Sequence, residues 1–101
     1  MVQQTAEFAS AKKALSQLVF FKTGTEKSVQ VLALKQLANE VGNKPGPVAN
    51  GERTIINARA DAWLAICRLT ETIQHEPGAQ SIDRLWMNAL DAVKAWQRSC
   101  E

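Results

Sequence analysis

The chain has 101 residues, 46% of them hydrophobic and 22% charged, and its 12 Lys and Arg against 10 Asp and Glu give a formal net charge of +2. This length fits a single domain, residues 1–101, with a hydrophobic core that needs no metal or disulfide support. A charge so close to zero lacks the electrostatic footprint of a typical nucleic-acid-binding protein. No apolar run approaches the ~20 residues that span a bilayer, and no secretory signal is visible. We therefore expect a soluble, cytoplasmic protein that binds neither membrane nor nucleic acid.

The first two segments of the chain are predicted to be amphipathic helices. Apolar residues recur at helical spacing from about residue 5 to 20. A second helix is predicted over 25–41, with Thr25 as its N-cap and Gly42 after its end. The run from 28 to 32 (SVQVL) also fits a short strand, because β-branched residues favour strands. The helix formers of the LALKQLANEV continuation favour the helix instead.

The second half of the chain is predicted to contain two more helices. Residues 42–52 (GNKPGPVANGE) hold three Gly and two Pro and are expected to form a loop. The third helix is predicted over 53–75 and is apolar around more than half of its circumference, which indicates a central position. The fourth is predicted over 81–99 with Ser81 as N-cap and one apolar arc. The fold expected is all-α, a compact bundle of about four helices with the third at its centre.

No catalytic group emerges from the pattern of residues. The only histidine, His75, fits the last turn of the third helix, where the helix dipole favours a cation. Cys67 and Cys100 would lie ~16 Å apart along a hairpin of the last two helices, beyond the ~7 Å Cα limit of a disulfide. We expect two free thiols, as in a reducing compartment. No metal-ligand spacing and no nucleotide-binding motif is present, so we expect neither an enzyme nor a metal or cofactor.

Several residues are candidates for contact with a protein partner. Val29 and Leu32 lie off the main apolar stripe of the second helix and need a cover. Arg59 falls inside the apolar arc of the third helix, where an arginine must be paired, reach the rim or meet a partner. Trp63, Trp86 and Trp96 all lie on core-facing arcs, and Trp96 is the one nearest the end of its helix. The predicted partner-binding set is Val29, Leu32, Lys44, Asn50, Arg53, Arg59 and Trp96.

These features favour a non-enzymatic binding protein: a small helical regulator, adaptor or inhibitor of the kind that phages and mobile elements encode. The partner expected is another protein or a second copy of the chain. An apolar patch around Phe20, Val29, Leu32 and Ala33 predicts a homodimer, since two-fold self-association is the commonest way to cover such a patch.

An alternative function is the binding of a phosphate-bearing small molecule, such as a nucleotide or cyclic nucleotide. The residues concerned are Lys22, Thr23, Gly24, Thr25 and Lys27. This turn enters a predicted helix N-terminus, where unpaired N–H groups attract anions, although Glu26 competes for the same field.

The same turn carries a resemblance to a known family. Gly24-x-Glu26-Lys27-Ser28, followed by Val29, Val31 and Leu34, resembles the G-x-E-K-S entry of a helical-hairpin family in small phage proteins. Some members of that family sequester cyclic oligonucleotides, and the resemblance implies the same activity for this chain. It covers about eleven of the 101 positions. The aromatic- and alanine-rich continuation of the family is replaced here by residues 37–40 (LANE).

Overall fold

Four α-helices make up most of the described chain: α1 (Thr5–Gly24), α2 (Lys27–Gly42), α3 (Arg53–His75) and α4 (Ile82–Ser99). The computed structural model describes residues 5–24, 26–42 and 53–100, except for the side chains of 5–7, 27, 53 and 54. The all-α bundle of four helices is confirmed. The segment that also fitted a strand belongs to α2, and α1 extends four residues beyond its predicted end. Most of the predicted loop lies outside the described residues.

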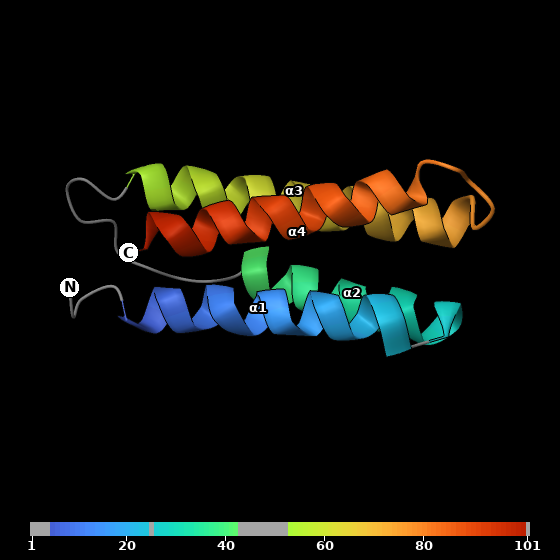
Figure 1. Cartoon of the computed structure of the whole chain (residues 1–101), viewed down its shortest axis with the longest axis horizontal. Coiled ribbons are helices and arrows are strands. Elements are labelled where there is room, and N and C mark those ends of the chain that lie inside the picture. Colours follow the sequence, from blue (N-terminus) through green and yellow to red (C-terminus); the bar gives the residue numbers. More distant parts are fainter. Residues whose placement is uncertain (1–4, 25, 43–52, 101) are drawn as a thin grey trace.

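The helices run alternately up and down and form a ring, as Figure 1 shows. Each one packs against two neighbours: α1 against α2 and α4, and α3 against α2 and α4. Within the described residues no Cα atom of α1 lies within 8 Å of one in α3, and the same holds for α2 and α4. The bundle measures 43 × 19 × 19 Å along its principal axes. The third helix therefore occupies a corner of the bundle and not its centre.

The interior is formed by one apolar stripe from each helix. In α4 the stripe follows the predicted arc, and Trp86, Ala89, Leu90, Val93 and Trp96 are buried. Ala11, Ala14 and Leu18 supply the stripe of α1, and Leu34, Leu37, Ala38 and Val41 that of α2. From α3 come Ile55, Ala62, Ile66, Leu69 and Ile73. Because α3 is a corner helix, its other apolar residues lie outside this core. Leu64 is therefore exposed, although its neighbours in the sequence are apolar.

A buried polar side chain joins α1 to α2. Gln30 is buried among the core residues of α2, and its Nε2 donates a hydrogen bond of 2.7 Å to the carbonyl oxygen of Phe21. Phe21 belongs to the last four residues of α1, whose carbonyl groups have no partner within the helix. Gln30 thus acts as a C-terminal cap for α1 supplied by the next helix.

The α3–α4 connection differs from the predicted cap. Ser81 has αR backbone angles (φ −76°, ψ −7°), and its side chain makes no capping hydrogen bond. Its contribution comes from the backbone, since its carbonyl accepts a hydrogen bond of 2.9 Å from the N–H of Leu85.

Cys67 and Cys100 are both free of disulfide bonds, as the helix spacing predicts. None of the helices described is long and apolar enough to cross a membrane.

Candidate functional site

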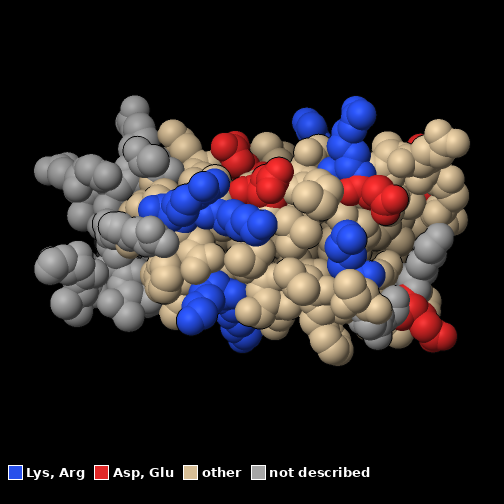
Figure 2. All heavy atoms as spheres, in the orientation of Figure 1, with Lys and Arg blue, Asp and Glu red and all other residues tan. Residues whose placement is uncertain are grey.

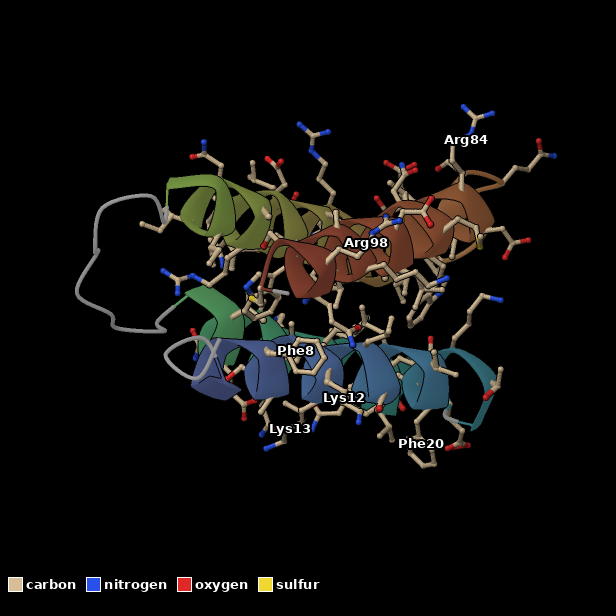
Figure 3. The ribbon with its side chains drawn as sticks, turned by 60° about the vertical axis from the view of Figure 1, so that its left-hand side comes forward. Phe8, Lys12, Lys13, Phe20, Arg84 and Arg98 are labelled. Carbon is tan, nitrogen blue, oxygen red and sulfur yellow. The ribbon has the colours of Figure 1, made fainter. Side chains whose placement is uncertain are left out.

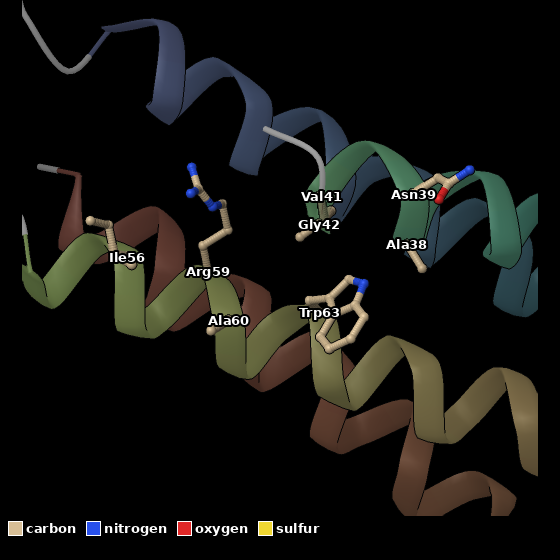
Figure 4. A pocket seen from close by; sticks show the side chains of 8 residues that line it. All are labelled: Ala38, Asn39, Val41, Gly42, Ile56, Arg59, Ala60 and Trp63. Carbon is tan, nitrogen blue, oxygen red and sulfur yellow. The ribbon is translucent and has the colours of Figure 1, made fainter. Parts of the chain in front are cut away.

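A groove between α2 and the first half of α3 has both aromatic and charged walls. Ile56, Arg59, Ala60 and Trp63 follow one another at the i, i+3, i+4, i+7 spacing of a single helix face. They line a pocket of about 310 Å³ together with Ala38, Asn39, Val41 and Gly42 from α2. Figure 4 shows Trp63 lying below Gly42 at the end of α2, with Arg59 rising from α3 on the side of Ile56.

The pocket exists because the facing side chains are small. Ala38 and Gly42 on α2 and Ala60 on α3 are small residues, and they line the pocket together with the larger Arg59 and Trp63. The indole of Trp63 lies directly on Gly42: its Nε1 is 2.6 Å and its Cδ1 2.8 Å from the point that a Cβ on this glycine would occupy. Gly42 therefore provides the room that seats the indole. Even so, 39% of Trp63 remains exposed to solvent.

A second hollow of about 560 Å³ continues the groove on the other side of Trp63. Its polar walls include Lys35 of α2 and Glu71 of α3, and Cys67 also lines it. The pKa of the Cys67 thiol is raised above its usual value, first by burial and then by the nearby Glu71 carboxylate. The thiol is therefore protonated at neutral pH and is a weak nucleophile.

Three large apolar side chains of the α1–α2 hairpin are exposed, and we call Phe20, Val29 and Leu32 the hairpin patch. These three side chains are between 51% and 63% exposed. Phe20 lies in the last turn but one of α1 and the other two lie in the first two turns of α2, so all three are at the same end of the bundle. Figure 3 shows Phe20 pointing away from the rest of the molecule.

Charged side chains on the face formed by α1 and α4 form no continuous region of one sign among the described residues. On the face formed by α1 and α4, Lys and Arg side chains alternate with Asp, Glu and neutral residues where the described residues form it (Figure 2). Along α4 itself, Asp83 and Asp91 are interspersed with Arg84, Lys94 and Arg98. Such a mixed face is typical of a solvated helix surface.

The predicted partner-binding residues fall into three groups in the structure. Val29 and Leu32 are on the surface in the hairpin patch, and Arg59 is half-buried in the wall of the α2–α3 groove. Trp96 is only 1% exposed and belongs to the core, so it cannot contact a partner while the bundle is intact. The prediction for Trp96 is corrected on this ground, because α1 and α3 both flank the end of α4 and cover its inner face. Lys44 and Asn50 lie outside the described residues, as does the side chain of Arg53.

The predicted anion-binding turn is divided between two helices. Lys22 and Thr23 belong to the last turn of α1, where the helix dipole favours cations and not anions. The Thr23 hydroxyl donates a hydrogen bond of 3.2 Å to the carbonyl of Val19. Gly24 is the last residue of α1. Thr25 and the side chain of Lys27 lie outside the described part of the chain. The described residues thus place Lys22 and Thr23 at the helix end less suited to a phosphate.

The sequence did not single out Trp63 and Gly42. A helical wheel of α3 places Trp63 on the apolar arc, and Gly42 reads as a helix terminator. Their contact depends on where the end of α2 meets α3, which no local pattern contains. Within residues 5–24, 26–42 and 53–100, no group of three His, Cys, Asp or Glu residues is placed to hold a metal ion.

Comparison with known proteins assigns no function to the α2–α3 groove or to the hairpin patch. No protein-family model matches the chain, and no curated protein or solved structure matches it either. The resemblance to the phage helical hairpins thus rests on residues 24–34, which contain the end of α1 and the first half of α2.

Proposed function

We propose that the protein acts by binding other protein surfaces, as a small helical regulator, adaptor or inhibitor without catalytic activity, and that the hairpin patch is its contact surface. The observation that supports the proposal is the exposure of Phe20, Val29 and Leu32 at one end of the bundle. Single exposed apolar residues are common on proteins, but large ones gathered on one surface are typical of interaction sites.

A second copy of the chain is the partner we propose first. A two-fold axis passing beside Leu32 brings equivalent apolar side chains together from both copies, and such self-complementary contacts are the commonest form of oligomer. The net charge of +2 produces little repulsion between two copies. Val29 and Phe20 would then be covered by the same contact, which removes the most exposed apolar side chains of α1 and α2 from water.

Sedimentation equilibrium at micromolar concentration tests the dimer directly. The wild-type chain should sediment at twice its mass of 11.1 kDa. Leu32→Glu places a charge in the contact and should shift the protein to 11.1 kDa while its helical circular dichroism is unchanged. Gln36→Glu is the matched control, because Gln36 is also exposed and lies about one turn further along α2. A wild-type chain that remains a single 11.1 kDa species would reject the homodimer.

The same two variants test the wider proposal of a protein partner. Affinity capture from the native host, followed by mass spectrometry, should retain a partner on the wild-type chain and on Gln36→Glu but not on Leu32→Glu. A partner that Leu32→Glu retains with unchanged affinity contradicts the assignment of the contact to the hairpin patch. An isolated monomer with no retained partner contradicts the proposed function itself.

A further inference from the structure

The pocket between Gly42 and Ile56 combines features that suit a small ligand and that the hairpin patch lacks. Its volume of about 310 Å³ lies at the lower end of the usual range for small-molecule sites. One wall is the partly exposed indole of Trp63, held in place by Gly42 beneath it. The aliphatic side chains of Ile56, Val41 and Ala38 complete the apolar part of the lining.

Arg59 gives this pocket its charge. It is the only charged side chain among the described residues that line the pocket. Arg59 also takes part in an interaction within the chain. Its guanidinium carries five N–H donors, which leaves capacity for a second, external acceptor. The pocket is therefore complementary to a negative charge beside an apolar wall.

The relative placement of the two side chains sets the shape of the occupant. Arg59 and Trp63 are four residues apart on α3, so they lie one above the other on the same face, about 6 Å apart along the helix axis. Figure 4 shows Trp63 extending toward the end of α2, with Arg59 rising beside it from the same face of α3. A ring lying against the indole would place a group attached at its edge within reach of the guanidinium. Aromatic faces and arginine together favour a planar, anionic molecule.

We propose that this pocket binds a planar aromatic molecule that carries one anionic group, with the ring against Trp63 and the anion on Arg59. The site shares no residue with the hairpin patch, so it stands or falls independently of the proposed protein contact. The test uses 1-naphthoate as the probe, for which an affinity of about 1 mM is expected from its size.

The binding experiment follows the indole N–H signals of the three tryptophans by ¹H–¹⁵N NMR. Titration with 1-naphthoate should shift the Trp63 signal saturably, and the Trp63→Phe variant identifies that signal by its disappearance. The signals of Trp86 and Trp96, which are buried in the core, should move little. The uncharged analogue 1-naphthalenemethanol should bind at least about tenfold more weakly, because it forms no charge-assisted hydrogen bond with Arg59.

Two substitutions at the exposed Ala60 keep the test independent of folding. Ala60→Glu adds a carboxylate at the pocket wall and should weaken 1-naphthoate binding at least about tenfold, because this carboxylate repels the anion of the probe. Ala60→Gln has nearly the same size without the charge and should bind within about twofold of the wild type. Arg59→Gln should weaken binding to the level of the uncharged analogue, whereas Arg68→Gln, on the exposed surface of the same helix, should have no effect. Equal binding of the two probes, equal binding by the two Ala60 variants, or shifts confined to Trp86 and Trp96 would each overturn the proposal.

Discussion

The indole of Trp63 occupies the space that a side chain on Gly42 would need, with Nε1 2.6 Å from the position of the absent Cβ. Gly42→Ala must therefore displace the indole. We expect this variant to lose about 1 kcal/mol of unfolding free energy and to show red-shifted tryptophan fluorescence, because Trp63 is pushed toward solvent. In a Trp63→Ala background the clash is gone, and the same change should be neutral or stabilising by up to about 1 kcal/mol, since alanine is the better helix former.

A double-mutant cycle from denaturant unfolding measures this reversal of sign. The four proteins required are the wild type, each single variant and the double variant, and the coupling energy should be about 1–2 kcal/mol. If Gly42→Ala has the same effect in both backgrounds, Trp63 and Gly42 are not in contact in solution.

Arg59 and Asp61 lie two residues apart on α3 but face different surroundings. Arg59 is half-buried and lines the groove, whereas Asp61 is exposed. Arg59→Ala should therefore lower the unfolding free energy by about 1 kcal/mol, and Asp61→Ala should change it by no more than about 0.5 kcal/mol. Urea titrations of both variants provide the comparison. A loss of several kcal/mol for Arg59→Ala would show instead that the guanidinium belongs to a fully buried ion pair.

Substitution of Gln30 measures how much this one side chain stabilises the α1–α2 hairpin. Gln30→Met preserves the approximate volume but leaves the carbonyl of Phe21 without its hydrogen bond. The expected cost is about 1–2 kcal/mol, the usual penalty for an unsatisfied buried polar group. Gln36→Met, at an exposed position of the same helix, should stay within about 0.5 kcal/mol of the wild type. Equal unfolding curves for the two variants would contradict a capping role for Gln30.

Cys67 should react slowly with alkylating reagents. Only the thiolate reacts, and the pKa of Cys67 is raised by burial and by Glu71. Peptide mass spectrometry after iodoacetamide treatment should show slower modification of Cys67 in the folded protein than in urea-unfolded protein at pH 8. Glu71→Gln should speed the reaction only in part, because burial is the larger cause. Since the unfolded chain releases this proton at lower pH, the contribution of Cys67 to stability is complete below the usual thiol pKa and is lost as the pH rises through the raised value.

The sequence predicted best those helices whose apolar residues form one narrow stripe. In α4 the five buried residues from Trp86 to Trp96 are those of the predicted arc, because a single stripe can face only one way. The predicted central position of α3 was wrong because the apolar residues of this helix do not form one narrow stripe. Its many alanines make the helix look apolar on most sides, yet alanine is compatible with a core, a groove or a surface. Only the packing of whole helices distinguishes these environments.

The candidate-site residues were likewise predicted correctly where the pattern of one helix decides their exposure, and wrongly where the packing between helices decides it. Val29 and Leu32 were predicted from their position off the stripe of α2, and both are exposed. All three tryptophans were predicted on core-facing arcs, and Trp86 and Trp96 are buried there, whereas Trp63 is 39% exposed in a groove. The further prediction that Trp96 contacts a partner is wrong, because only 1% of it is exposed. Helix-end position suggested exposure for Trp96, but α3 and α1 extend as far as the end of α4 and enclose it. The hydrogen bond between Gln30 and Phe21 likewise joins two helices, so neither helix alone could predict it.

Each helix in the ring contacts two neighbours. The order of the helices along the chain can therefore be changed while the same pairs of helices stay in contact. The start of α1 and the end of α4 lie at the same end of the bundle, on adjacent helices (Figure 1). A short linker between these two ends, with the chain opened between α2 and α3, gives the order α3–α4–α1–α2. Every one of the four helix pairs would remain adjacent in this circular permutant, and only the connections would change. The architecture thus depends on which helix faces meet and tolerates a different path of the chain through them.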